Sequence, residues 1–160
     1  MALIDQVNKY KQMMIGKVAE KMVVTIDQPP VIAPKYLKDL SQAKVALVTT
    51  SGVHLKTQPP FNVKGDATFR LIPRDATSHM LTITHDHYDK RSAEKDLNCV
   101  FPLAHLKAFE QEGKIAQVGP RHIGLMGYIP QVKTLMTKTA VDIADIFEQD
   151  GIDIVILSPG

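Results

Sequence analysis

The sequence of 160 residues has no tryptophan, a single cysteine and no long apolar run. Cys99 has no second cysteine to pair with, which excludes an internal disulfide and favours a reducing compartment. We expect it to be a buried structural thiol. The first twenty residues are interrupted by charges, and no stretch is apolar enough to span a bilayer. We therefore expect a cytoplasmic protein with no membrane partner.

The charges are nearly balanced, with 19 Lys and Arg against 17 Asp and Glu, a net charge of +2. No block of basic residues and no alternation of basic and aromatic residues is present. A nucleic-acid-binding surface would need such a concentration of positive charge. We therefore expect no nucleic-acid partner.

The chain divides into an N-terminal segment, residues 1–40, and an α/β domain, residues 41–160. Apolar residues at helical spacing over 3–23 predict an amphipathic helix, and the prolines after it predict an extended arm. This helix either covers the core of the same chain or packs on a partner.

The second segment alternates predicted strands and helices. Compact apolar or alternating runs predict strands over 45–50, 68–72, 79–87 and 152–157, and helical periodicity predicts helices over 102–113 and 130–149. Strands and helices in this order favour right-handed crossovers. The prediction is a three-layer α/β fold with a mainly parallel sheet and flanking helices.

The chain ends in Ser158-Pro159-Gly160, directly after the last predicted strand, which we expect to be buried. In open α/β sheets the ligand crevice lies beyond the carboxyl ends of the strands. The chain thus stops where a loop is expected to deliver a functional group, and the final covering helix is missing. The alternative is an edge strand with a short polar tail.

The densest polar cluster contains His85, His87 and Asp89. Two imidazoles two residues apart on a strand lie on one face and can share a zinc ion with a nearby carboxylate, so a zinc-dependent hydrolase is one hypothesis. A second is that both histidines only bond to loop backbone. A third, which we prefer, is that they line an active-site crevice as acid, base or orienting groups.

Two further sites are candidates for anion binding. Arg121-His122 follows a Gly-Pro pair at the start of a possible short helix and could hold a carboxylate, or Arg121 could simply be solvated. The segment Thr49-Thr50-Ser51-Gly52, at the end of the first strand, could offer hydroxyl and N–H donors to an anion, or it could be a plain turn.

Six segments, in order along the chain, resemble one family. They are ALVTTSGVHLK (46–56), GDATFRLI (65–72), HDHYD (85–89), DLNCVFPL (96–103), GPRHIGLMGYI (119–129) and GIDIVILSPG (151–160). The set resembles the selenoprotein B family of glycine, sarcosine, betaine and D-proline reductases, and most resembles its D-proline reductase members. The resemblance implies a selenocysteine immediately after Gly160, with a cysteine a few residues later. The chain as given is then truncated, lacks its nucleophile and is expected to be inactive by itself.

The chemistry implied by the resemblance is reductive C–N bond cleavage in amino-acid fermentation, converting D-proline to 5-aminovalerate. A pyruvoyl group on a partner subunit captures the substrate amine, the selenolate attacks the α-carbon, and an electron-donating reductase reopens the selenide-sulfide that forms. The supporting shell would be His85, His87, Asp89, Arg121 and His122. A glycine, betaine or sarcosine reductase component, the zinc hydrolase, and a non-catalytic module that only binds a partner remain alternatives.

Overall fold

The computed structural model describes residues 39–86 and 88–159 of the chain. The predicted N-terminal helix and Pro-rich arm lie outside these residues. No helix within the described ranges is both long and apolar enough to cross a membrane.

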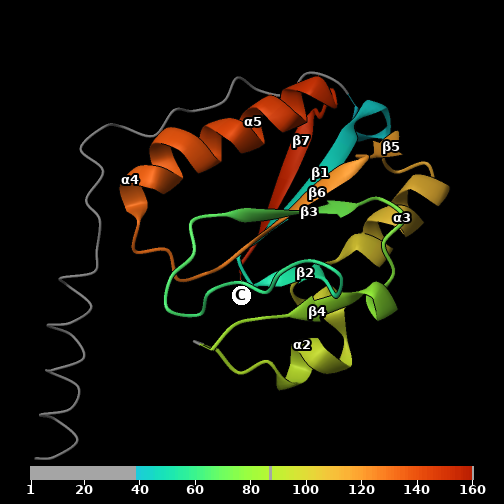
Figure 1. The fold of residues 1–160 in the computed structure, drawn as a ribbon. Helices are drawn as coiled ribbons and strands as arrows, with labels where there is room; N and C mark the ends of the chain where they lie inside the picture. The colour runs from blue at the N-terminus through green and yellow to red at the C-terminus, as the bar shows by residue number, and fades with distance from the viewer. Residues whose placement is uncertain (1–38, 87, 160) are drawn as a thin grey trace, which may run out of the picture. The chain divides into compact units, whose positions relative to one another are not determined.

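A mixed sheet forms the centre of the domain (Figure 1). Its central strand, β1 (Lys44–Thr49), pairs in parallel with β7 (Ile154–Ser158) along one edge. Along the other edge it pairs in parallel with β5 (Gln117–Val118) and then β6 (Arg121–Leu125). Strand β3 (Phe69–Pro73) lies antiparallel to β6. The outer strands thus enclose a β1 that is apolar and almost entirely buried.

The α/β class is confirmed, and the sheet is mixed, because β3 joins the parallel strands β1, β5, β6 and β7 in the antiparallel direction. A parallel partner requires a crossover of a dozen or more residues, usually with a helix. Residues 53–68 between β1 and β3 contain the short β2 (Val53–Leu55) and a loop but no helix. After this loop the chain returns to the sheet at β3, which pairs antiparallel with the later strand β6.

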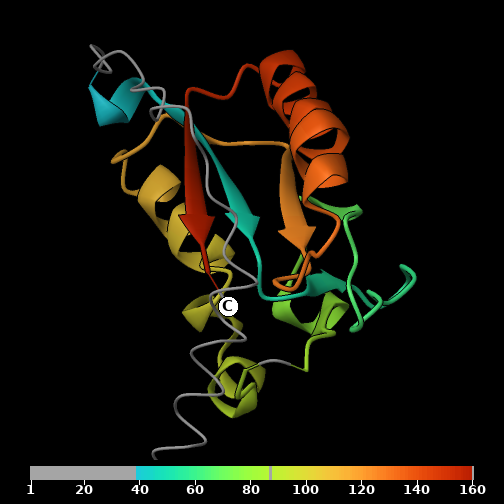
Figure 2. The ribbon, with the colours of Figure 1, turned by 90° about the vertical axis from the view of Figure 1, so that its left-hand side faces the viewer.

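One face of the sheet is covered by a helix that starts as α4 (Val132–Thr134), passes through the π-helical η4 (Leu135–Thr139) and continues as α5 (Ala140–Gln149). This confirms the helix predicted over 130–149. Apolar side chains of α5 and of the strands share one buried cluster, namely Ala46, Val48, Ile123, Leu125, Ile143 and Phe147. Helix α3 (Leu103–Gln111), which matches the other predicted helix, lies on the opposite side of the strands (Figure 2).

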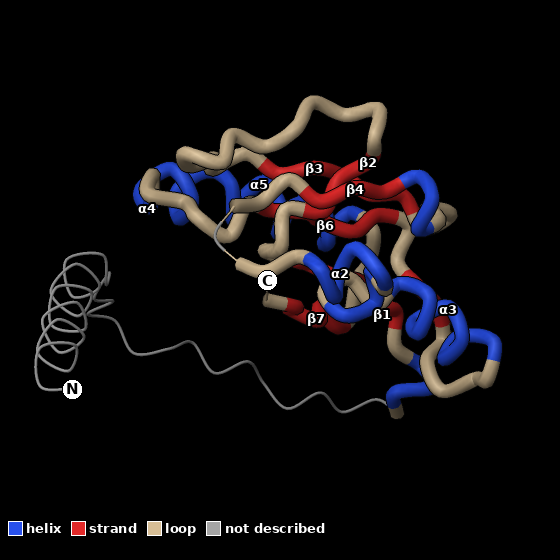
Figure 3. Tube along the Cα trace, turned by 90° about the horizontal axis from the view of Figure 1, so that it is seen from below, coloured by secondary structure: helices blue, strands red, loops and turns tan. Residues whose placement is uncertain are grey.

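A second, two-stranded sheet lies at the carboxyl end of β1, where β2 pairs antiparallel with β4 (Leu81–Ile83). Short helices complete this end, namely η2 (Ser78–Met80), α2 (Arg91–Lys95) and η3 (Leu97–Cys99), while η1 (Leu40–Gln42) precedes β1. Figure 3 views the molecule from this edge, with α2, β2 and β4 in front of the central sheet. The strand predicted over 79–87 is shorter than expected because the chain first makes the tight turn of η2.

Two burial predictions are wrong. The last strand exists, but in β7 the exposed fractions of Val155, Ile156 and Leu157 are 38%, 41% and 74%. Strand β7 pairs only with β1 among the described strands, and α5 packs over β1 and β6 instead, so these side chains are left uncovered. Cys99, predicted to be buried, is exposed at the end of η3.

Candidate functional site

Four chain segments meet at the carboxyl edge of the central sheet. The N–H of Thr50, just after β1, donates to the carbonyl of Ser158 in β7 at 3.1 Å. The N–H of Gly52 donates to the carbonyl of Leu125 in β6 at 2.9 Å, and the Gly52 carbonyl accepts from Thr84 at 2.9 Å. Backbone hydrogen bonds thus bring together the ends of β1, β4, β6 and β7. We call the residues at this junction the strand-end cluster: Thr50, Ser51, Gly52, His85, Gly127 and Ser158.

The turn after β1 is held by two buried hydroxyls. The Thr49 hydroxyl donates to the carbonyl of Val100 at 2.8 Å, and the Ser51 hydroxyl lies 2.6 Å from the Thr49 oxygen. Since the Thr49 proton is used on Val100, the Ser51 hydroxyl is the donor to Thr49. The Ser51 N–H also donates to the Thr49 oxygen, at 3.2 Å.

The three backbone N–H groups of residues 50–52 therefore all donate inside the fold. This geometry supports the plain-turn alternative over an anion-binding turn, because no backbone donor of the turn is left for a ligand. The turn needs a glycine at position 52 for two reasons. The φ of Gly52 is +76°, which other residues rarely adopt, and a Cβ there would clash with the Thr84 carbonyl.

His85 is the buried imidazole of the strand-end cluster, with only 4% of its surface exposed. It lies against Gly127, which is exposed just past β6. A Cβ on Gly127 would be 2.6 Å from His85 Nε2 and 2.8 Å from the Thr50 carbonyl oxygen. The Gly127 backbone therefore packs closely against both His85 and Thr50. Because Gly127 has no side chain, there is room for the His85 imidazole at this position.

Tyr88 anchors the loop that carries His85. Its ring packs edge-on against His85 with 4.6 Å between ring centroids, and its hydroxyl donates to the Ser51 carbonyl at 3.1 Å. Burial raises the pKa of the Tyr88 phenol above its ordinary value. The phenol therefore acts as a neutral donor that holds this loop on the turn after β1.

The described members of the predicted shell other than His85 do not join the strand-end cluster; they are Asp89, Arg121 and His122. Asp89 is exposed and binds Arg91, with 2.9 Å between Oδ1 and Nε, and this bond to Arg91 lowers the pKa of Asp89. His87 and Gly160 lie outside the described residues, and Pro159 is exposed just beyond β7.

The prediction that Arg121 and His122 start a helix is wrong, because both belong to β6. Apolar Ile123 and Leu125 supply the alternating pattern of a strand there. Arg121 is at the amino end of β6, away from the strand-end cluster, and binds Asp150 through two bonds of 2.8 Å. It therefore joins the sheet to the end of α5 and does not face the predicted site.

His122 is fully buried within the sheet. Its Nδ1 accepts the N–H of Leu47 in β1 at 3.1 Å, so the ring replaces a carbonyl acceptor between the two strands. The other nitrogen, Nε2, is buried without a hydrogen-bond partner, and the ring lies edge-on to Phe101 at 6.0 Å. Burial, followed by the nearby charges of Lys107 and Arg74, lowers the pKa of His122 from 6.5 to about 4. The residue is a neutral structural imidazole.

The zinc-hydrolase hypothesis depends on His87, which lies outside the described residues. Among residues 39–86 and 88–159, no three His, Cys, Asp or Glu side chains gather closely enough to hold a metal ion. Asp89, the proposed carboxylate ligand, is bound to Arg91.

The architecture defines an α/β domain with a buried imidazole at the junction of its strand carboxyl ends. The chain belongs to the glycine/sarcosine/betaine reductase selenoprotein B family, whose sequence model matches residues 6–159. The family expected from the six sequence segments is thereby confirmed.

The chain is similar in sequence to subunits of three amino-acid and betaine reductases. The D-proline reductase subunit gamma of Acetoanaerobium sticklandii is 38% identical over 140 residues, which cover 88% of this chain and 57% of the relative. The glycine reductase complex component B subunit gamma of Carboxydothermus hydrogenoformans is 31% identical over 76% of this chain and 29% of its own length. The betaine reductase complex component B subunit beta of Peptoclostridium acidaminophilum is 29% identical over 82% of this chain and 31% of its own length. The chain thus spans between about a third and just over half of these relatives, and no solved structure matches it.

Sequence reasoning assigned no role to two residues of this region, Tyr88 and Gly127. Tyr88 and Gly127 lie inside segments that carry the family resemblance, HDHYD and GPRHIGLMGYI. A glycine two residues past a strand is a signal for close approach of another group, and it could have indicated Gly127. Nothing in the local pattern indicates that the Thr49 hydroxyl bonds to a carbonyl 51 residues away.

Proposed function

We propose that this chain is a subunit of a cytoplasmic, D-proline reductase-like complex that cleaves a C–N bond of D-proline reductively to give 5-aminovalerate. The observation that carries the proposal is the 38% identity to a D-proline reductase subunit over 88% of this chain. The lower identities to the glycine and betaine reductase components support the same reaction type and make those substrates the second candidates.

In this proposal the reacting group is a selenocysteine that follows Gly160 in the full-length polypeptide. The bond between the Thr50 N–H and the Ser158 carbonyl holds the end of β7 inside the strand-end cluster. A group delivered just past β7 would therefore enter solvent beside that cluster, at the edge where open α/β sheets hold their ligands. The selenolate would supply the nucleophile, and the two electrons would come from the selenolate and the nearby cysteine thiol as they join in a selenide-sulfide. A pyruvoyl group on the partner subunit would supply the electrophile that holds the substrate amine.

The residues of this chain position that chemistry. His85 is the titratable side chain at the junction, and we assign it the transfer or orientation of a proton near the reacting group. Tyr88 and Gly127 hold its ring in place through the contacts described above. Asp89 and Arg121 are engaged with Arg91 and Asp150, and we assign them no part in the reaction.

The proposal requires two partners, a subunit that carries the pyruvoyl group and a reductase that donates electrons. The test uses the full-length natural polypeptide purified with its partner subunits and offered D-proline, glycine, sarcosine or betaine with a dithiol reductant. Formation of 5-aminovalerate from D-proline alone is the expected result. Consumption of glycine, sarcosine or betaine instead would assign the chain to the second candidate, and no consumption of any of the four would overturn the reductase proposal.

Two matched histidine variants test the assignment of His85. We expect His85→Gln to lower kcat by about 100-fold or more, the range typical of acid-base groups. His79→Gln changes an exposed imidazole in η2 and is expected to leave kcat unchanged. Equal kcat values for the two variants would remove His85 from the mechanism.

A further inference from the structure

Strand β7 is apolar, yet most of it is exposed. Its sequence, IVILS, contains no charged residue and no proline, and Leu157 is 74% exposed. Strands at a water-facing edge are usually protected by charges or prolines. Among residues 39–86 and 88–159, no strand pairs with the outer edge of β7. The sequence of β7 is therefore typical of a strand inside a sheet, although it lies at the edge.

The register of β7 shows which face its exposed side chains share. Val155 pairs with Ala46 of β1 in parallel. In the same way Leu157 pairs with Val48. Paired residues point to the same face of a sheet, and Ala46 and Val48 belong to the buried cluster that includes α5. Val155 and Leu157 therefore lie on the α5 face, where α5 covers β1 and β6 but not β7.

The backbone groups of these two residues point to the open edge. The carbonyl of Ser158 accepts the Thr50 N–H, so the polar backbone groups of Ser158 face β1. Successive residues of a strand direct these groups to opposite edges. The N–H and C=O groups of Val155 and Leu157 therefore point away from β1. Strand β7 thus presents both an apolar face and a row of backbone donors and acceptors.

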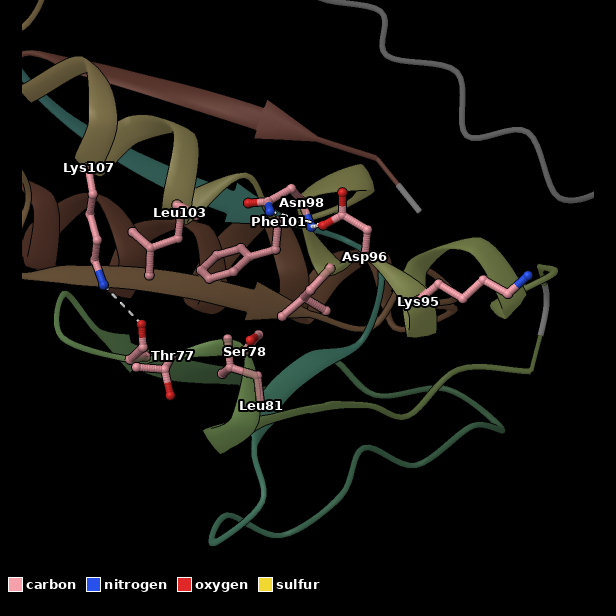
Figure 4. A pocket seen from close by; sticks show the side chains of 12 residues that line it. Thr77, Ser78, Leu81, Lys95, Asp96, Asn98, Phe101, Leu103 and Lys107 are labelled. Carbon is pink, nitrogen blue, oxygen red and sulfur yellow. Dashed lines mark hydrogen bonds between the residues drawn. The ribbon is translucent and has the colours of Figure 1, made fainter. Parts of the chain in front are cut away.

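This surface is separate from two cavities of the domain. One, of about 340 Å³, lies between β4 and α3 (Figure 4), and a neighbouring one of about 380 Å³ lies beside α2. No residue of β7 lines either of them. The exposed surface of β7 therefore fits another strand and helix better than a small molecule.

We propose that the polypeptide after Gly160 covers β7 with one further helix and strand. The strand pairs in parallel with the outer edge of β7, and the helix packs on Val155 and Leu157 beside α5. The inference rests on the continuation past Gly160 that the proposed function requires. The match covers 57% of the D-proline reductase relative, so about two fifths of that polypeptide lies outside it. This length is ample for a crossover of a dozen or more residues.

The direction of the chain across the sheet determines the face of the new helix. The connection from β6 through α5 to β7 crosses β1, because β6 and β7 lie on opposite edges of β1. A strand added outside β7 continues in the same direction. Crossovers between parallel strands share one hand, so two steps in the same direction place their helices on the same face. The new helix therefore lies on the α5 face, which is the face of Leu157.

The added unit would also complete the site at the strand ends. After β1 the chain returns to the sheet through α3, on the side opposite α5 (Figure 2). After β7 it would leave over the α5 side. Open α/β sheets hold their ligands where the connections of neighbouring strands leave on opposite sides. That position, between the ends of β1 and β7, is where Thr50 bonds to Ser158.

Amide hydrogen exchange tests whether the outer edge of β7 is covered. The natural polypeptide, with cysteine in place of selenocysteine, is compared with the chain that ends at Gly160, each as a monomer. We expect the amide protons of Val155 and Leu157 to exchange about 100-fold or more slowly in the longer polypeptide, where a neighbouring strand binds them. Equal exchange in both would overturn the proposal, and so would protection that appears only on adding a partner subunit or on dimerisation.

This test gives an answer that is separable from the proposed function. A protected β7 in a complex that reduces none of the four substrates would support the inference and contradict the function. An unprotected β7 in a complex that reduces D-proline would contradict the inference and support the function.

Two matched alanine variants of the longer polypeptide provide an independent check by urea unfolding. Leu157→Ala should lower the urea midpoint by about 1 M or more, as is typical of removing a buried leucine side chain. The control is Val141→Ala, an exposed position on the side of α5 opposite Ile143, which should leave the midpoint unchanged. If the two variants have equal midpoints, Leu157 is not covered and the proposal is wrong.

Discussion

Acidification from about pH 7 to about pH 5 is expected to destabilise the fold through His122. The ring is fully buried, and its Nδ1 accepts the Leu47 N–H between β6 and β1. A protonated imidazole has a donor at both nitrogens, so it cannot accept that bond. Protonation would also place a charge in the sheet near Lys107 and Arg74, which is why the pKa of His122 is lowered to about 4.

The sign and size of the effect follow from the two pKa values. The folded-state pKa of about 4 lies below the ordinary value of 6.5, so the unfolded chain binds more protons between these pH values. The contribution of His122 to stability is complete above about pH 6.5 and is lost as the pH falls toward about 4. Each unit of pKa difference corresponds to about 1.4 kcal/mol, which gives a total loss of roughly 3 kcal/mol, of which about 2 kcal/mol is reached near pH 5.

The assay is urea unfolding of the whole chain at several pH values, for the wild type and two variants. His122→Gln does not titrate, and its amide oxygen can accept the Leu47 N–H. It is expected to be less stable than the wild type near neutral pH, but to lose about 2 kcal/mol less on going to about pH 5. His79→Gln, which changes an exposed histidine, controls for general effects of removing an imidazole. Parallel pH dependence of the wild type and His122→Gln would refute the reasoning.

Three further substitutions test the contacts described above by urea unfolding at neutral pH. Gly127→Ala should lower the free energy of unfolding by about 1–3 kcal/mol because its Cβ would crowd His85. Adding His85→Ala to this variant should recover part of that loss. If the losses of the two single variants simply add in the double variant, the contact between residues 85 and 127 is contradicted. Thr49→Val should cost about 1–3 kcal/mol by leaving buried polar groups unpaired, whereas a neutral result would mean that its hydroxyl bond does not stabilise the turn. Arg121→Met should lower the free energy of unfolding through loss of the bidentate bond to Asp150 and should leave reductase activity intact; a selective loss of activity would return Arg121 to the site.

The elements that could be predicted from sequence are those with strong local signals. The apolar run of β1 and the periodicity of residues 130–149 indicate their structures without reference to the rest of the chain. The antiparallel direction of β3 could not be predicted, because it depends on which distant strand residues 69–73 pair with. The exposure of β7 likewise depends on where α5 packs, which its own apolar sequence does not reveal.

The sequence could predict the part of the candidate site that lies at the carboxyl ends of the strands. Thr50, His85 and Ser158 all lie just after predicted strands or at their ends, and the sheet brings them to one edge. Asp89 and Arg121 differ, because each is paired with another charged residue of the fold, Arg91 or Asp150, and the local sequence does not indicate that partner. A charged residue close in sequence to a cluster is therefore weaker evidence for function than the end of a buried strand.

The most direct test of the central claim is mass spectrometry of the natural polypeptide from its source cells, across the end of β7. The account predicts a peptide that continues from Ser158-Pro159-Gly160 into selenocysteine, with a cysteine a few residues later. A natural polypeptide that ends at Gly160, or that continues without selenocysteine or cysteine at the next position, would contradict it.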